Sequence, residues 1–158
     1  MKMKGFWRLG FAAAVASTMV SCGNGAAPGV LQVVSTTSFG MCAGYCSTRL
    51  EISEGAAVLT RTSRGGRGAQ ELPEQRFTQT LTRDEWVEIT HLAAAAKFHG
   101  LPPVIGCPDC ADGGAESLTI IGYAVPETVS FEHGATVEQV QPLLDRVRAL
   151  RAKLTPKS

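Results

Sequence analysis

Apolar and polar residues alternate through the first half of the chain in a pattern typical of half-buried strands. Residues 30–37 are rich in β-forming side chains, and residues 49–53 alternate strictly between polar and apolar. Glu54-Gly55 is a turn signal, so residues 57–62 are expected to return as the second strand of a hairpin. Residues 75–81 fit one further strand.

The spacing of apolar residues then changes to the helical period. Thr82 and Glu85 form a capping box that predicts the start of a helix, with Leu81 and Trp86 as its hydrophobic staple. Gly100 is expected as the left-handed C-terminal cap, because two prolines follow it closely. The apolar stripe of this helix consists of Trp86, Ile89, Ala93 and Ala96.

The last third of the chain predicts a second hairpin and a closing helix. Residues 118–120 and 129–131 are expected as its strands, with Pro126 near the turn. Residues 136–154 carry an amphipathic helical pattern. Pro142 would break hydrogen bonds inside that helix, so its regular part is expected to begin near Gln141, with Pro142 in the first turn.

This order of elements predicts an α+β fold. The succession β-β-β-(β)-α-β-β-α favours a mainly antiparallel sheet with two helices on one face. Residues 30–155 are long enough for one domain of this kind. The hydrophobic content of 44% also excludes a disordered chain.

The N-terminus has the pattern of an export signal. Lys2, Lys4 and Arg8 precede an uncharged stretch at residues 9–20, which is too short to span a membrane. The sequence Met-Val-Ser-Cys that ends at Cys22 resembles the lipobox of bacterial lipoproteins. The resemblance implies a signal peptide at residues 1–21, a lipidated Cys22 and a flexible tether at residues 22–29. The alternative is an ordinary secretory peptide that is cleaved elsewhere, with Cys22 as one more thiol.

The lipobox also implies an address. Two or three acyl chains on Cys22 would anchor the protein stably in a membrane. Gly23 follows the cysteine, and by enterobacterial sorting rules the absence of Asp there favours the outer membrane, with the domain facing the periplasm. Removing residues 1–21 takes three of the fifteen basic residues, which leaves 12 against 14 acidic ones. A charge of −2 gives no case for nucleic-acid binding.

Four further cysteines carry the candidate chemistry, and three interpretations stay open. Cys42, Cys46, Cys107 and Cys110 could form two structural disulfides, which an oxidising compartment favours. They could bind zinc through four thiolates. Cys107 and Cys110 could instead perform thiol redox chemistry, although no helix pattern follows Cys110. A calcium site at Asp109, Asp112 and Glu116 is a further alternative, but its spacing departs from the known calcium loop.

The connectivity of any disulfides is open as well, because four cysteines allow three pairings. A Cys42–Cys46 bridge would close five residues and contribute about 2 kcal/mol. A bridge between the two pairs would close more than sixty residues and contribute about 4 kcal/mol. If both pairs are adjacent in space, cross-pairing is therefore the more effective link.

Two segments around these cysteines resemble a known family. Residues 39–46 read Phe-Gly-Met-Cys-Ala-Gly-Tyr-Cys, and residues 106–116 read Gly-Cys-Pro-Asp-Cys-Ala-Asp-Gly-Gly-Ala-Glu. They look like the signature blocks of a family of bacterial lipoproteins of unknown function, which similarly place a Trp helix between the blocks and a Val-x-Phe-Glu strand after them. Trp86 and residues 129–132 match those features. The resemblance implies that the two cysteine loops pair, and it implies no activity.

The function expected from the sequence is a non-catalytic binding or envelope-accessory role. No nucleophile elbow, His-Glu-x-x-His motif or phosphate-binding loop occurs in the sequence. We therefore expect no enzyme, no cofactor apart from the zinc alternative, and a recognition surface formed by the two cysteine loops. Arg61, Arg64 and Arg67 are expected in a solvated hairpin loop. The candidate residues of the recognition surface are Phe39, Tyr45, Asp109, Asp112 and Glu116.

Overall fold

The computed structural model describes residues 25–64 and 71–156, whose elements follow the expected order with a few short additions. The strands are β1 (Val30–Ser38), β2 (Tyr45–Ser53), β3 (Ala56–Ser63), β4 (Gln75–Thr80), β5 (Val104–Ile105), β6 (Ala115–Gly122) and β7 (Glu127–Glu132). The helices are α1 (Arg83–Ala95) and α2 (Gln141–Leu154), with the short 3₁₀ helices η1 (Cys110–Asp112) and η2 (Glu138–Val140).

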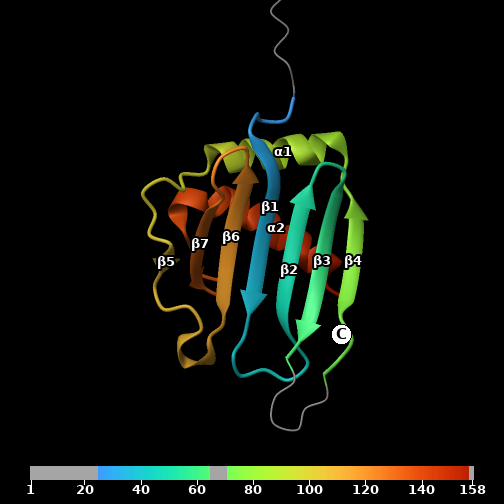
Figure 1. Cartoon of the computed structure of the whole chain (residues 1–158), viewed down its shortest axis with the longest axis vertical. Coiled ribbons are helices and arrows are strands. Elements are labelled where there is room, and N and C mark those ends of the chain that lie inside the picture. The colour runs from blue at the N-terminus through green and yellow to red at the C-terminus, as the bar shows by residue number, and fades with distance from the viewer. Residues whose placement is uncertain (1–24, 65–70, 157–158) are drawn as a thin grey trace, which may run out of the picture.

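The strands of the described chain form one seven-stranded sheet in the order β4-β3-β2-β1-β6-β7-β5 (Figure 1). Every neighbouring pair is antiparallel except β5 and β7. The predicted α+β class with a mainly antiparallel sheet is confirmed. Strand β5 was not expected, because two residues show no periodicity. It joins the sheet after α1, where it lies beside β7 at the edge.

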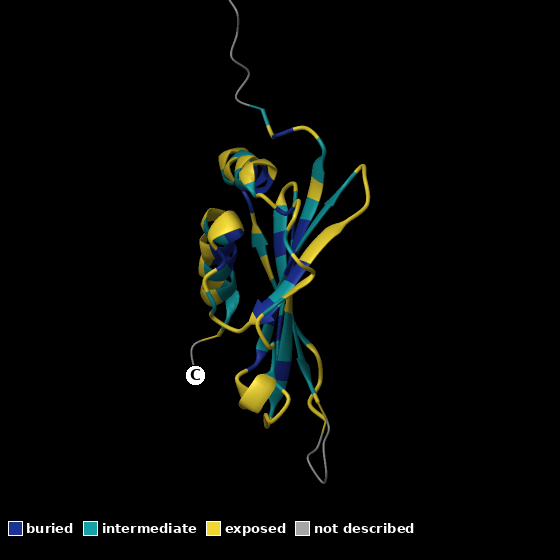
Figure 2. Cartoon of the chain, turned by 90° about the vertical axis from the view of Figure 1, so that its left-hand side faces the viewer, coloured by how far each residue is buried: buried dark blue, intermediate teal, exposed yellow. Residues whose placement is uncertain are grey.

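Both α-helices cover the same face of the sheet, as the sequence predicts (Figure 2). The register places Val33 opposite both Ile52 and Ile120, so apolar side chains gather on that face. The strands and helices bury most of these side chains completely, with Leu50 and Leu143 both fully inaccessible. The hydrophobic core therefore lies between the sheet and the two helices.

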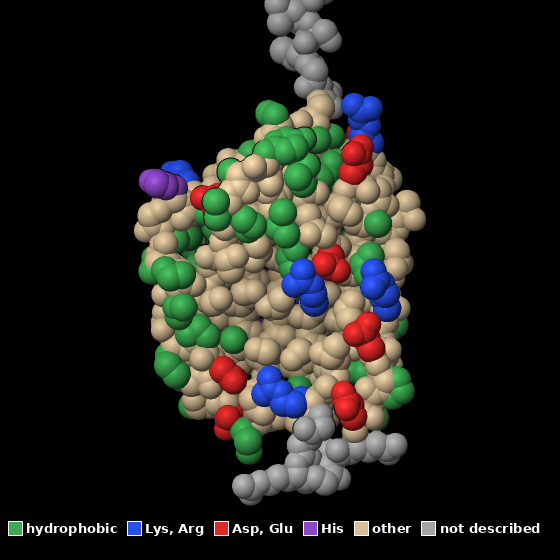
Figure 3. Space-filling model, in the orientation of Figure 1, with side chains coloured by type: hydrophobic (Ala, Val, Ile, Leu, Met, Phe, Trp, Pro, Cys, Tyr) green, Lys and Arg blue, Asp and Glu red, His purple; other side chains and the backbone are tan. Residues whose placement is uncertain are grey.

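The opposite face of the sheet carries small hydroxyl side chains. Thr36 and Ser117 share a hydrogen bond of 2.6 Å across β1 and β6, and Thr119 and Thr128 share one of 2.9 Å across β6 and β7. The space-filling view shows this face with scattered charges and few hydrophobic side chains away from its edges (Figure 3). The paired hydroxyl groups make this face polar.

Helix α1 begins where the capping box predicts. The Thr82 hydroxyl accepts a hydrogen bond from the Glu85 amide, and the Glu85 carboxylate accepts one from the Thr82 amide. The hydrogen bond from the Thr82 backbone also lowers the pKa of Glu85. The expected cap at Gly100 is wrong: the helix ends at Ala95, with Ala96 as its cap. The amide of Lys97 instead donates to the carbonyl of Gln139, which draws the chain away from the helix axis.

Helix α2 begins at Gln141 with Pro142 in its first turn, so the interpretation of that proline is confirmed. The helix follows directly on η2, which accounts for the helical pattern that starts several residues earlier. The side-chain Oε1 of Gln141 accepts a hydrogen bond from the amide of Val137, the residue that precedes η2. The two helices thus leave their apolar stripes facing the sheet.

The segment before β1 is attached to the domain. Ala27 is buried, and its amide donates to the Thr90 hydroxyl at 3.0 Å. His91 Nε2 donates to the Gly25 carbonyl at 3.0 Å. Gly25 and Ala27, which lie in the predicted tether, thus both contact α1. Cys22 and the signal sequence lie outside the described residues. Within residues 25–64 and 71–156, no helix is long and apolar enough to cross a membrane.

Candidate functional site

The two cysteine loops, residues 39–46 and 106–116, lie side by side at one end of the sheet (Figure 1). They meet because β1 pairs with β6: Ser38 at the end of β1 stands opposite Ala115 at the start of β6. The first loop follows β1, and the second leads into β6. Pairing of the strands, rather than a cross-link between the loops, brings the two segments together.

A hydrogen bond joins the two loops directly. Asp109 Oδ1 accepts the Gly40 amide at 3.1 Å. A Cβ atom at position 40 would lie 2.7 Å from Asp109 Oδ2, so a larger residue there would require the Asp109 side chain to move. Asp109 itself has a left-handed backbone, with φ of 61°. This conformation suits Asp better than most residues, and it directs a carboxylate at the neighbouring loop.

An aromatic contact closes the same junction. The Phe39 ring packs over Gly114, where a Cβ atom would collide with the ring. Gly114 has φ of +83°, and its carbonyl accepts the amides of both Asp109 and His133. The Phe39 ring also meets the His133 ring edge-on, with centroids 4.9 Å apart. Phe39 therefore bridges the first loop, the second loop and the end of β7.

Each cysteine lies close to the other cysteine of its own loop. Cys42 lies beside Cys46 and Cys107 beside Cys110, each pair with Cα atoms 5.5 Å apart, a separation compatible with a disulfide. The expectation that cross-pairing would link the loops is wrong, because each pair sits within its own tight turn. Cys46 is buried, whereas Cys107 and Cys110 are exposed.

Strand β7 contributes to the position of the second loop. Glu132 at the end of β7 accepts the Cys107 amide at 3.1 Å. Gly106 has φ of +70°, and a Cβ there would lie 2.9 Å from Glu132 Oε1. The Val-Ser-Phe-Glu segment and the second cysteine block, which the sequence resemblance brought together, are thus in contact.

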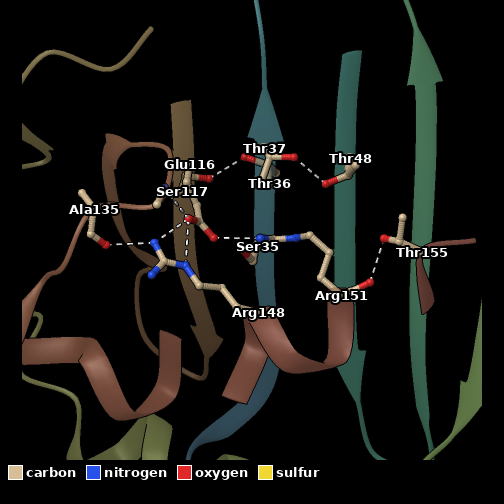
Figure 4. A network of polar contacts seen from close by, with 11 residues as sticks. Ser35, Thr36, Thr37, Thr48, Glu116, Ser117, Ala135, Arg148, Arg151 and Thr155 are labelled. Carbon is tan, nitrogen blue, oxygen red and sulfur yellow. Dashed lines mark hydrogen bonds and ion pairs between the residues drawn. The ribbon is translucent and has the colours of Figure 1, made fainter. Parts of the chain in front are cut away.

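Glu116 was expected on the recognition surface, but its side chain is 1% exposed. Its carboxylate forms ion pairs with Arg148 at 2.7 Å and Arg151 at 2.8 Å, both from α2 (Figure 4). Burial raises the pKa of Glu116, but hydrogen bonds and positive charge from the two arginines outweigh this effect and hold the pKa below its ordinary value. Glu116 therefore ties the sheet to α2 beneath the loops.

Hydroxyl groups on β1 and β2 complete this buried polar cluster. Arg151 donates to Ser35 Oγ, and Arg148 donates to the Ala135 carbonyl at 2.9 Å. Thr37 and Thr48 share a hydrogen bond of 2.7 Å on the same face. A hollow of about 540 Å³ opens beside the cluster, with His133 and both arginines in its wall.

Tyr45 connects the first loop to β3 and to the segment that precedes β4. Its hydroxyl donates to the Pro73 carbonyl at 2.9 Å, and the Arg61 guanidinium lies 4.7 Å above its ring. Arg61 also donates to Gln75, while Arg64 is exposed. Arg67 lies outside the described residues, so the expected arginine loop is described only in part.

The acidic residues of the second loop lie in three different environments. Asp109 holds Gly40, Glu116 is paired with arginines, and Asp112 is exposed in a left-handed conformation. Across the described parts of the chain, no group of three or more His, Cys, Asp or Glu side chains could hold a metal ion. The zinc and calcium interpretations remain predictions from sequence.

No protein-family model matches the chain, and no match is found among curated proteins.

The sequence reasoning missed the two arginines that define the buried cluster. Arg148 and Arg151 continue the line of Leu144 and Val147 along α2, so basic residues on the buried stripe were the available signal. A second signal lies in β1, where the inward positions change from Val33 to Ser35 and then to Thr37. Such a change to hydroxyl side chains indicates a polar partner beneath that half of the sheet.

Proposed function

We propose that this chain is an exported bacterial lipoprotein of the family that its two cysteine blocks resemble. The mature protein would be anchored through acylated Cys22 in the outer membrane and would face the periplasm. The two cysteine loops would form a non-catalytic recognition surface for an envelope partner. We assign no reaction to it.

One observation carries this proposal: the loops lie at the opposite end of the sheet from the N-terminal segment (Figure 1). Strand β1 connects the two ends, with Val30 beside the N-terminal segment and Ser38 beside the first loop. Nine residues of strand span about 30 Å. An anchor at Cys22 would therefore present the loops away from the bilayer, where a partner can reach them.

The contacts at this end support a recognition role. Asp109, Phe39 and Glu132 fix the backbones of both loops from several directions. Around these contacts, Met41 and the second loop from Cys110 to Gly113 remain exposed. A surface that is ordered before binding loses little conformational entropy when a partner docks.

The experiment places a photoreactive amino acid at Met41 or at Ala111 in the full-length protein and irradiates living cells. Thr78, on the exposed edge strand β4, is the matched control. The proposal expects the same discrete adduct from both loop positions, and none from Thr78. Adducts that appear equally at all three positions would overturn the recognition surface. Loss of radiolabelled acyl chains in Cys22→Ala tests the anchor separately.

Thiol–disulfide exchange at Cys107 and Cys110 is a second candidate, which the exposure of this pair favours. In the reduced pair, the Cys107 thiolate would attack a substrate disulfide and release one substrate thiolate. Cys110 would then attack the mixed disulfide, which closes the pair and releases the second thiolate. Dithiothreitol-dependent insulin reduction that is lost in Cys107→Ser would support this candidate. Equal rates for both proteins would contradict it.

A further inference from the structure

A second exposed feature lies at the end of the molecule where the chain enters the sheet. The turn between β6 and β7, residues 123–126, carries Tyr123 at 83% exposure and Val125 at 85%. We call these four residues the apolar tip.

The apolar tip continues into an open hollow of about 740 Å³. The N-terminal segment contributes Pro28 to it, and α1 contributes Ala93 and Ala94. Of the described residues that line the hollow, Glu127 alone is charged. The space-filling view shows hydrophobic side chains gathered at this end, beside the place where the chain enters (Figure 3).

The N-terminal segment fixes the distance between this end and Cys22. Gly25 is held by His91, and Ala27 by Thr90, so the chain is already attached to the domain at Gly25. The Gly29 carbonyl packs so closely on Gly122 that a Cβ atom there would collide with it. Two residues lie between Gly25 and Cys22, so the three steps from one Cα atom to the next reach at most about 11 Å.

We propose that the apolar tip inserts into the headgroup region of the bilayer that holds the lipid anchor. This inference rests on the proposed acylation of Cys22. An anchor within about 11 Å of Gly25 leaves this end of the domain against the membrane surface. Tyrosine is enriched at membrane interfaces, and Val125 would leave water there. The contact would hold the sheet upright and keep the cysteine loops facing outward.

Tryptophan fluorescence tests the contact in the full-length lipoprotein, purified and reconstituted into phosphatidylethanolamine–phosphatidylglycerol vesicles. After removal of the signal sequence, the chain keeps one tryptophan, the buried Trp86, as a constant background. Tyr123→Trp adds a reporter at the apolar tip. Met41→Trp, at 77% exposure in the first cysteine loop, is the matched control. Acyl chains brominated near their carbonyl ends should quench most of the added emission at position 123 and none at position 41.

The outcomes separate this proposal from the proposed function. A protein without acyl chains by intact mass, which does not bind vesicles, contradicts the anchor itself. An acylated, vesicle-bound protein with unquenched emission at position 123 overturns only the membrane contact. Unquenched emission overturns the membrane contact at either wavelength. This holds for red emission, as in water, and for emission shifted to the blue because a second copy of the protein covers the reporter at high protein density. Val125→Trp should repeat the quenching seen at position 123, and its failure to do so would also count against the contact.

Discussion

Glu116 is the centre of the buried ion-pair cluster in this domain. Its two carboxylate oxygens receive two guanidinium groups in a position that is 1% exposed. The buried cluster therefore carries an excess of positive charge even when every group is ionised. Removing the carboxylate would leave both arginines without their counter-charge, which is the costly way to break a buried ion pair.

We expect Glu116→Gln to lower the free energy of unfolding by about 3–5 kcal/mol, because two charges lose their partner. Urea denaturation followed by circular dichroism measures this loss. Glu51→Gln is the matched control, since Glu51 pairs with Arg49 on the exposed face. Its loss should be within about 1 kcal/mol. Equal losses in the two variants would contradict the assigned role of Glu116.

The ion pairs of Glu116 also make the free energy of unfolding depend on pH in the acidic range. The two arginines hold the pKa of Glu116 below its ordinary value in the folded protein, so the stabilising contribution of Glu116 is complete above the unfolded-state pKa. The contribution is lost as the pH falls through the lower, folded-state pKa. The stability difference between wild type and Glu116→Gln should therefore shrink as the pH is lowered below about 4. A difference that stays constant over this range would be inconsistent with the ion pairs.

Gly114 offers a residue-level test of the loop junction. Gly114→Ala forces a Cβ atom into the Phe39 ring at a left-handed position, and we expect it to cost at least about 2 kcal/mol. Gly44→Ala is the matched control, because Gly44 is also left-handed but has open space around it. This substitution should lower the free energy of unfolding by only about 1 kcal/mol. Chemical denaturation of both variants decides the point, and equal costs would show that Phe39 does not constrain Gly114.

Among the secondary-structure elements, the register of the strands brings the two cysteine loops together, a role that was expected for disulfides between the loops. The pairing of β1 with β6 sets the two cysteine loops side by side, and the local cysteine pairs only tighten each turn. A short loop closed by a disulfide restricts the unfolded chain modestly, which sets the size of the effect expected from removing it.

We expect Cys107→Ala/Cys110→Ala to fold and to lose about 2 kcal/mol of stability, because the bridge closes only a short turn. The melting temperature should fall by several degrees. Reductant added to this variant should then remove only the contribution of Cys42 and Cys46. Failure to fold, or an unchanged melting temperature, would contradict a local structural bridge.

The strands, helices and their order could be predicted because each depends on local periodicity and capping. Thr82 with Glu85 and Pro142 mark helix starts through contacts within one turn. The cysteine connectivity could not be predicted, since it depends on which turns close tightly in three dimensions. The ion pairs of Glu116 were out of reach for the same reason: Arg148 and Arg151 lie 32 and 35 residues away along the chain.

At the scale of the whole molecule, the two ends of the sheet differ in character. One end holds the N-terminal segment and the apolar tip, and the other holds the paired cysteine loops (Figure 1). Between them, the helices cover one face of the sheet and leave a hydroxyl-rich face open. This polarity suits a domain that is held at one end and recognises a partner at the other.

An intact mass of the mature protein, taken natively and again after denaturation with alkylation, tests both the lipid anchor and the bridged loops. We expect acyl chains on an N-terminal Cys22, a protein mass about 4 Da below the reduced value, and no alkylation until reductant is added. Peptides from a digest should link Cys42 to Cys46 and Cys107 to Cys110. A native mass raised by one zinc, with four alkylatable thiols and no acyl chains, would contradict both the anchor and the bridged loops.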